Sequence, residues 1–378
     1  MMKKRIGIVT LPLNTNYGGI LQAYALQEVL KRMGYECDTF ECNYFPETSI
    51  LKTIKYFLIK SIKRYLLFQK VDTLFPYHKA KEIYIKNNIE KQLNVRSFVK
   101  SYISLLEIRN FKEIPNNYDC LVVGSDQVWR PKYFEENRIS HAYLAFAKDW
   151  IVRKISYAAS FGTDEWEYTE EQTEECKELI QKFDAVSVRE ASAISMVKDH
   201  FQVDSIHVLD PTMLLMKEDY EKLVANANVK QIEGDLFCYV LDEKEDISTF
   251  IHQVASQYHL TPFSVGIPDN RKSIFEQIQP PLEQWLRGFM DARLVITDSF
   301  HACVFSIIFH KPFIVVGNEE RGNARFTSLL LLFGLKNRIV VNGKIPSDAL
   351  KPLPDSVYEK LEEMQIISIE YLRKHLPD

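Results

Sequence analysis

Five polar loops contain the side chains that could do chemistry, and each follows a stretch expected to be a buried strand. The fifth, residues 296–303, reads Ile-Thr-Asp-Ser-Phe-His-Ala-Cys. Thr-Asp-Ser predicts a helix N-cap at Ser299, which places His301 in the first helical turn. A histidine at the positive end of a helix can bind an anion or pass a proton. An ordinary half-buried histidine would give the same pattern, so this loop alone does not decide.

Two other loops supply carboxylates and a cation. Residues 123–130 read Val-Gly-Ser-Asp-Gln-Val-Trp-Arg, and residues 187–190 read Ser-Val-Arg-Glu. Arg189 at a strand end could clamp a carboxylate or phosphate, whereas a surface pair with Glu190 is the simpler alternative. The first of these loops also offers hydrogen-bonding groups and a flat face on which a sugar could stack: Ser125, Asp126, Gln127 and Trp129.

Glycines and small residues mark the remaining two loops. The chain has only 13 glycines in 378 residues, roughly half the usual share, so their positions are informative. Residues 13–19, Leu-Asn-Thr-Asn-Tyr-Gly-Gly, would let a ligand approach free N–H groups at a helix start, although a plain strand–helix turn is as good a reading. Neither a dinucleotide fingerprint nor a Walker A loop is present. The expected ligand-binding residues of these loops are Asn16, Gly18, Gly19 and Ser160, and Ser299 is expected to bind substrate from the fifth loop.

The segments between the loops alternate between strand and helix. Buried-strand runs such as 6–9 and 118–123 are followed by helical spacing, and the alternation starts again after residue 212. This predicts the α/β class with two Rossmann-like domains facing a cleft, where the strand-end loops meet. We divide the chain into an N-terminal domain over 1–212, a C-terminal domain over 213–350, and a C-terminal helix over 351–378 that packs back on them.

One segment, residues 50–112, interrupts the alternation. It has no glycine and carries 14 Lys/Arg against 4 Asp/Glu, which predicts a basic helical insertion in the N-terminal domain. Within it, residues 50–70 form an amphipathic pattern with a basic face. Such a helix could contact an anionic membrane surface. Packing on the sheet with a solvated basic face is the commoner alternative.

Composition excludes several classes of protein. The net charge of −4 gives no basic balance for nucleic acid. Six cysteines without a C-x-x-C pair argue against a zinc site or a disulfide scaffold and suit a reducing cytoplasm. The N-terminus has no signal-peptide pattern, and no run of about 18 apolar residues predicts a membrane span. We therefore expect a cytoplasmic protein that could associate with the membrane surface, without a bound metal.

Taken in order, these motifs resemble the polysaccharide pyruvyl transferase family. The resemblance extends from residue 5 to about residue 340, and the combined order of its motifs is specific although each piece is short. The segments that carry it are residues 16–26, 118–119, 123–129, 156–162, 187–190, 209–212, 297–301 and 305–306.

The resemblance implies a fold like that of GT-B glycosyltransferases, with the acceptor on the N-terminal side and the donor on the C-terminal side. It implies transfer of pyruvate from phosphoenolpyruvate, a donor substrate and not a cofactor, onto two hydroxyls of a saccharide acceptor that could be lipid-linked. By motif position, Arg189 and His301 would hold phosphoenolpyruvate. The family's third cation, a lysine, has no clear match, so Arg321 or Arg325 would replace it. Ala302 stands where the family often has glycine.

The implied chemistry needs cations for two anionic groups, an acid and a base. We expect Arg189 and Arg325 as anion clamps, His301 as clamp or proton donor, and Asp126 or Glu190 as the base. Replacing Arg189 or His301 by alanine should then abolish transfer with little effect on the melting temperature. The alternatives are a glycosyltransferase that uses a nucleotide sugar, and a non-catalytic sugar-binding protein of the same fold.

Overall fold

A parallel sheet forms the N-terminal half in the computed structural model, which describes residues 3–42, 57–59, 61–62, 91–134, 138–242, 245–266, 278–317, 323–340 and 343–378. The strand order is β3-β2-β1-β4-β5. Single bridges, Ile155 to Ala185 and Ala159 to Val188, continue this sheet to a parallel pair, β6 and β7. The strands are β1 (Arg5–Val9), β2 (Glu36–Cys42), β3 (Leu105–Ile108), β4 (Cys120–Val123), β5 (Arg153–Ser156), β6 (Ser187–Val188) and β7 (Ile206–His207).

This order reverses between β1 and β4, as in a doubly wound Rossmann sheet, so the loops after those two strands flank the crevice where ligands bind in such folds. The strands form because short apolar runs such as Cys-Leu-Val-Val in β4 are buried along their whole length. Helix α1 (Tyr17–Arg32) follows β1. It ends before Gly34, whose backbone φ of 100° lies in the left-handed region that glycine adopts without strain.

A second parallel sheet forms the C-terminal half in the order β11-β10-β8-β9, with its reversal between β8 and β10. Its strands are β8 (Leu236–Tyr239), β9 (Pro262–Phe263), β10 (Leu294–Thr297) and β11 (Phe313–Val315). Among the described residues, the other α-helices are α4 (Leu93–Tyr102), α5 (Glu170–Ile180), α6 (Ser192–Met196), α7 (Lys217–Ala227), α8 (Glu245–Tyr258), α9 (Leu282–Asp291), α10 (Phe300–Ile308), α11 (Asn323–Leu332) and α12 (Asp355–His375). The predicted α/β class with two Rossmann-like parallel sheets is confirmed.

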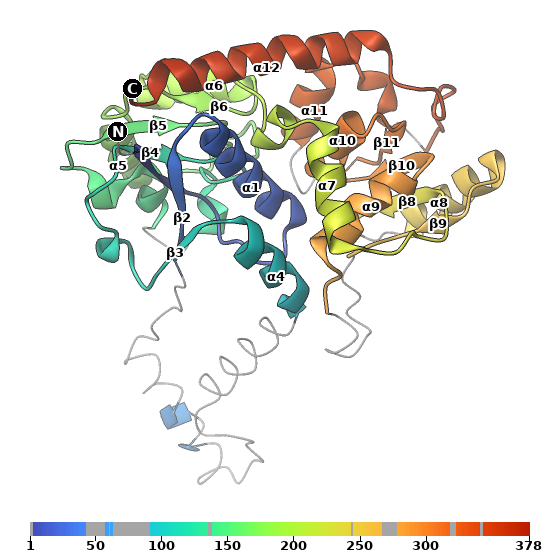
Figure 1. Cartoon of the computed structure of the whole chain (residues 1–378), viewed down its shortest axis with the longest axis horizontal. Coiled ribbons are helices and arrows are strands. Elements are labelled where there is room, and N and C mark those ends of the chain that lie inside the picture. Colours follow the sequence, from blue (N-terminus) through green and yellow to red (C-terminus); the bar gives the residue numbers. More distant parts are fainter. Residues whose placement is uncertain are drawn as a thin grey trace.

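The two halves are joined by a long helix and a shared core. Figure 1 shows α12, in red, running along one side of both halves. Tyr371 of α12 donates a hydrogen bond to the carbonyl of Ser156 (2.9 Å), and Ser368 accepts one from the N–H of Leu209 (3.0 Å). One hydrophobic cluster also takes in residues of both halves, including Leu21 of α1 and Phe305 of α10. The division at 212 and 350 remains a prediction.

The predicted helical insertion over 50–112 is wrong in its last part. Residues 105–108 form strand β3, which pairs in parallel with β2 from Thr39↔Leu105 to Cys42↔Ile108. The pairing supplies backbone partners that local spacing could not indicate. Most of the amphipathic segment 50–70 lies outside the described residues. Across the part of the chain that is described, no helix combines the length and apolar character needed to cross a membrane.

Candidate active site

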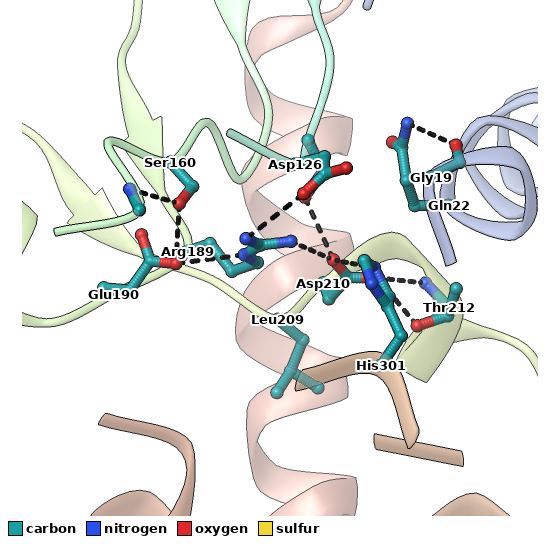
Figure 2. Close-up of polar contacts among 12 residues, drawn as sticks. Gly19, Gln22, Asp126, Ser160, Arg189, Glu190, Leu209, Asp210, Thr212 and His301 are labelled. Atoms are coloured by element: carbon teal, nitrogen blue, oxygen red, sulfur yellow. Dashed lines mark hydrogen bonds and ion pairs between the residues drawn. The ribbon is translucent and has the colours of Figure 1, made fainter. Parts of the chain in front are cut away.

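Loops from the carboxyl ends of both sheets meet around one buried arginine (Figure 2). Arg189 follows β6, Asp126 follows β4, and Asp210 follows β7, whereas His301 comes from the start of α10 in the other half. The figure shows these four side chains and Glu190 pointing toward one another. The sequence therefore predicted correctly that strand-end loops 123–130, 187–190 and 296–303 converge.

Arg189 is held by three carboxylates. Its Nε donates to Glu190 Oε1 (3.1 Å), its Nη1 donates to Asp210 Oδ2 (3.0 Å), and its Nη2 lies 3.6 Å from Asp126 Oδ1. The guanidinium carbon lies 4.3 Å from the centre of the Phe300 ring, a cation–π contact. Burial alone would lower the pKa of Arg189, but the charges of Glu190, Asp210 and Asp126 raise it. The simple surface pair with Glu190 is thereby excluded, because the Arg189 side chain is only 1% exposed.

Arg189 Nη2 and His301 Nε2 are buried and make no hydrogen bond to any described residue. They are held at the junction of the two halves by Asp126 and Asp210 respectively. A buried nitrogen without a partner costs free energy, and two such nitrogens in one cluster indicate a place for oxygen atoms of a ligand. Because Nε and Nη1 of Arg189 already donate to carboxylates, Nη2 is the nitrogen left to bind an anion.

Asp210 is the functional residue that sequence reasoning missed. Its Oδ1 accepts from the N–H (3.1 Å) and hydroxyl (2.7 Å) of Thr212, while its Oδ2 accepts from Arg189 and from Ser125 Oγ (3.1 Å). His301 Nε2 lies 3.6 Å from the same Oδ2. Burial alone would raise the pKa of Asp210, but His301, Arg189 and Thr212 lower it well below its ordinary value. A carboxylate directly after a strand was the available signal.

Asp126 lies across the switch point of the first sheet. Its φ of 67° is left-handed, which is uncommon for a residue other than glycine. A bridge to Ala159 holds this backbone, and Ser160 donates its N–H to the Asp126 carbonyl (3.1 Å). Asn16 Nδ2 donates to Asp126 Oδ2 (3.2 Å) from the loop after β1. The left-handed backbone therefore turns the Asp126 carboxylate toward the loop that follows β1.

Glu190 is more firmly bound than Asp126. Its Oε1 accepts from Ser160 Oγ (2.7 Å) as well as from Arg189 Nε. Ser160 Oγ in turn accepts from the N–H of Gly162 (3.0 Å). The predicted substrate-binding residue Ser160 thus positions Glu190, as the buried Ser125 positions Asp210.

Trp129 does not face the cluster, which corrects its predicted role, whereas the predicted role of Gln127 stays a prediction. Trp129 is fully buried, donates its Nε1–H to the Ala142 carbonyl (3.1 Å) and stacks on Tyr143. An aromatic ring of this size after a strand fills the core, because burial stabilises it more than exposure. Gln127 Oε1 accepts from Arg130 Nη1 (3.1 Å), at the side where Gly162 leaves room for it.

The loop before His301 is held by Asp298 and not by a serine cap. Asp298 accepts from the N–H groups of Leu241 (2.8 Å) and Asp242 (3.1 Å), which ties together the loops at the second switch point. Ser299 is the N-cap residue of α10, as predicted, but its side chain makes no capping hydrogen bond. Its N–H donates instead to Thr297 Oγ1 (2.9 Å).

Two predicted cations cannot be placed. Arg321 lies outside the described residues, and Arg325 belongs to α11 without a described side chain. A small pocket beside the cluster is lined by Arg189, Asp210 and Phe300 together with apolar residues of α11. Within the described ranges, no group of three or more His, Cys, Asp or Glu side chains is arranged to hold a metal ion.

Gly18, in the first turn of α1, packs directly against the His301 ring. A Cβ built there would overlap the imidazole ring of His301, whereas one at Gly19 would meet only the exposed side chain of Asn16 at 3.0 Å and Asp126 Oδ2 at 3.3 Å. Glycine at 18 is thus required by the packing of His301 and not by its backbone angles. The predicted ligand-binding role of both glycines stays a prediction.

We expect Gly18→Ala to destabilise the protein by about 1–3 kcal/mol, because the methyl group must displace a buried ring. Gly19→Ala serves as the matched control in the same helical turn, where the exposed Asn16 side chain can move aside and alanine favours helix. Urea unfolding of both variants measures the difference. Equal stability of the two variants would show that His301 does not rest on Gly18.

Comparisons with known proteins bear on the family and on the fold separately. The Polysaccharide pyruvyl transferase family model matches residues 16–320. No curated protein matches the chain. Among solved structures, S. aureus MnaA in complex with UDP is 11% identical over 96% of this chain and 88% of its own, with a TM-score of 0.47. UDP-GlcNAc 2-epimerase from Neisseria meningitidis bound to UDP-GlcNAc is 14% identical over 99% and 100%, with a TM-score of 0.42.

A third solved structure, E. coli ADP-heptose lps heptosyltransferase II, is 9% identical over 97% of this chain and 100% of its own, with a TM-score of 0.36. These likenesses are too distant to bear on chemistry. The family match covers most of the chain, from Asn16 at the N-cap of α1 to residue 320, beyond β11 in the chain. It includes Asp126, Arg189, Asp210 and His301, which the structure brings together. The chain belongs to the polysaccharide pyruvyl transferase family.

Proposed function

We propose that this protein transfers pyruvate from phosphoenolpyruvate onto two hydroxyls of a sugar in a polysaccharide or its precursor, forming a ketal and releasing phosphate. The observation that carries the proposal is the pair of buried nitrogens, Arg189 Nη2 and His301 Nε2, that lack hydrogen bonds to described residues. They come from opposite halves of the chain. A donor with a carboxylate and a phosphate offers acceptor oxygens to both.

The reaction balances through two proton transfers. One proton adds to the methylene carbon of phosphoenolpyruvate, which leaves C2 open to attack. Two sugar hydroxyls then form two C2–O bonds as the C2–O bond to phosphate breaks. Of the two hydroxyl protons released, one replaces the proton given to the methylene carbon and the other leaves with phosphate. The protein must therefore supply an acid near that carbon and a base near the hydroxyls.

We assign the acid to His301 and the base to Asp126. Glu190, the other candidate base, already accepts hydrogen bonds from Ser160 and Arg189 through Oε1. Among described residues, the Asp126 carboxylate accepts one hydrogen bond, from Asn16, and its Oδ1 lies 3.6 Å from Arg189 Nη2. The acceptor sugar would then enter on the side of the loops after β1 and β4.

The donor needs more positive charge than the described cluster offers. Three carboxylates surround Arg189 there, so Arg321 or Arg325 would have to complete the donor site on the C-terminal side. Contact with a membrane surface through the basic segment 50–70, and a lipid-linked acceptor, also belong to the proposal. The same holds for a cytoplasmic location.

The deciding experiment measures phosphate released from phosphoenolpyruvate with a panel of oligosaccharide acceptors. We expect release only with a suitable acceptor, together with a mass gain of the acceptor that corresponds to one pyruvyl ketal. Incubation without acceptor is the control for simple hydrolysis. Saturable binding of UDP or GDP without any response to phosphoenolpyruvate would favour a nucleotide-sugar enzyme and contradict the proposal.

A further inference from the structure

We propose that Asp210 is a positioning residue that keeps a proton on Nε2 of the His301 ring, on the side of the ring that faces the cluster. This rests on the proposed function only where it concerns turnover. The two Asp210 carboxylate oxygens have different partners. Oδ1 is bound to Thr212, whereas Oδ2 faces Arg189, Ser125 and His301.

Helix capping explains only one of these oxygens. Asp210 is the N-cap residue of the 3-10 turn Pro211–Leu214, and its Oδ1 satisfies the N–H of Thr212 in that role. A cap needs nothing from Oδ2. Yet Oδ2 collects two hydrogen bonds from elsewhere in the N-terminal half and faces a ring from the C-terminal half (Figure 2). Asp210 therefore links Arg189 and His301 through a single atom.

The surroundings of the His301 ring differ at its two nitrogens. Nε2 faces the Asp210 carboxylate, which is ionised because its pKa lies well below its ordinary value. A lone pair on Nε2 would be repelled there, whereas an N–H is attracted. The Nδ1 side of the ring lies over Gly18 in the first turn of α1, where backbone N–H groups have no partners within the helix. That positive helix end favours a lone pair on Nδ1.

Nitrogen NMR of the folded, ligand-free protein tests this placement directly. With ¹⁵N-labelled histidine, and His301 assigned by comparison with His301→Gln, we expect the Nε2–H form in the wild-type protein. Asp210→Asn should shift His301 toward a mixture of the two forms. Thr212→Val is the matched control, because it removes a partner of Oδ1 and leaves Oδ2 unchanged, and it should keep the wild-type signal. An unprotonated Nε2 in wild type, or an unchanged signal in Asp210→Asn, overturns the proposal.

Turnover gives an independent readout. We expect Asp210→Asn to lower kcat by about 10²- to 10⁴-fold without raising KM for phosphoenolpyruvate, because Arg189 Nη1 is released at the same time. Thr249→Val should stay within about 3-fold of wild type, because Thr249 is exposed on α8 and its hydroxyl donates to the Glu245 carbonyl. Wild-type kcat in Asp210→Asn would remove the positioning role. Absence of any phosphoenolpyruvate turnover in the wild type would instead contradict the proposed function and leave the NMR result to decide on Asp210. If Asp210→Asn does not fold, the wild-type spectrum alone decides.

Discussion

His301→Ala is expected to lower pyruvyl transfer by at least about 10²- to 10⁴-fold, the usual contribution of a general acid or base. The variant loses the only described histidine that faces Asp210, and with it one of the two buried nitrogens assigned to the donor. The fold should survive, because the ring lies at a polar junction beside Asp210. We therefore expect a change in unfolding free energy below about 2 kcal/mol.

The matched control for this prediction is His252→Ala. His252 lies on an exposed position of α8, so its loss should change neither transfer nor stability. Steady-state assays of phosphate release, with urea unfolding in parallel, separate loss of chemistry from loss of folded protein. Full turnover by His301→Ala would show that His301 takes no part in the reaction, although its side chain lies in the cluster.

The convergence of the strand-end loops could be predicted because it depends on a general property of parallel sheets. Alternating strands and helices place loops such as 123–130 and 187–190 at one edge, whatever the details of packing. His301 in the first turn of α10 followed from local spacing in the same way. These are consequences of chain order, which a single sequence contains.

The partners of each side chain could not be predicted, because they depend on distances between segments far apart in sequence. Nothing local distinguishes Trp129 as a core residue from Trp129 as a sugar platform, and the structure buries it against Tyr143. Asp210 reads as a turn residue until the other half of the chain brings His301 to it. The pairing of 105–108 with β2 is non-local for the same reason.

Arg189 shows how such partners change an expectation. Read from the sequence, it is a clamp that could be removed at little cost to stability. In the structure, the Arg189 guanidinium forms ion pairs with three carboxylates, those of Asp126, Glu190 and Asp210. Its side chain is 1% exposed. Removing it would leave buried negative charges without compensation. We therefore expect Arg189→Met, which keeps much of the side-chain length, to destabilise the protein by about 3–5 kcal/mol.

The pH dependence of that loss identifies its cause. Without the guanidinium, burial raises the pKa of the remaining carboxyls above their unfolded values, so the folded variant binds more protons than the unfolded chain. Its stability relative to wild type should then recover as pH falls from 7 toward 5. The double variant Arg189→Met, Glu190→Gln removes one of the uncompensated charges and should regain part of the loss at pH 7. Urea unfolding at both pH values tests this. A loss that is the same at both, and that Glu190→Gln does not relieve, would mean that Arg189 stabilises the fold through packing on Phe300 and not through charge.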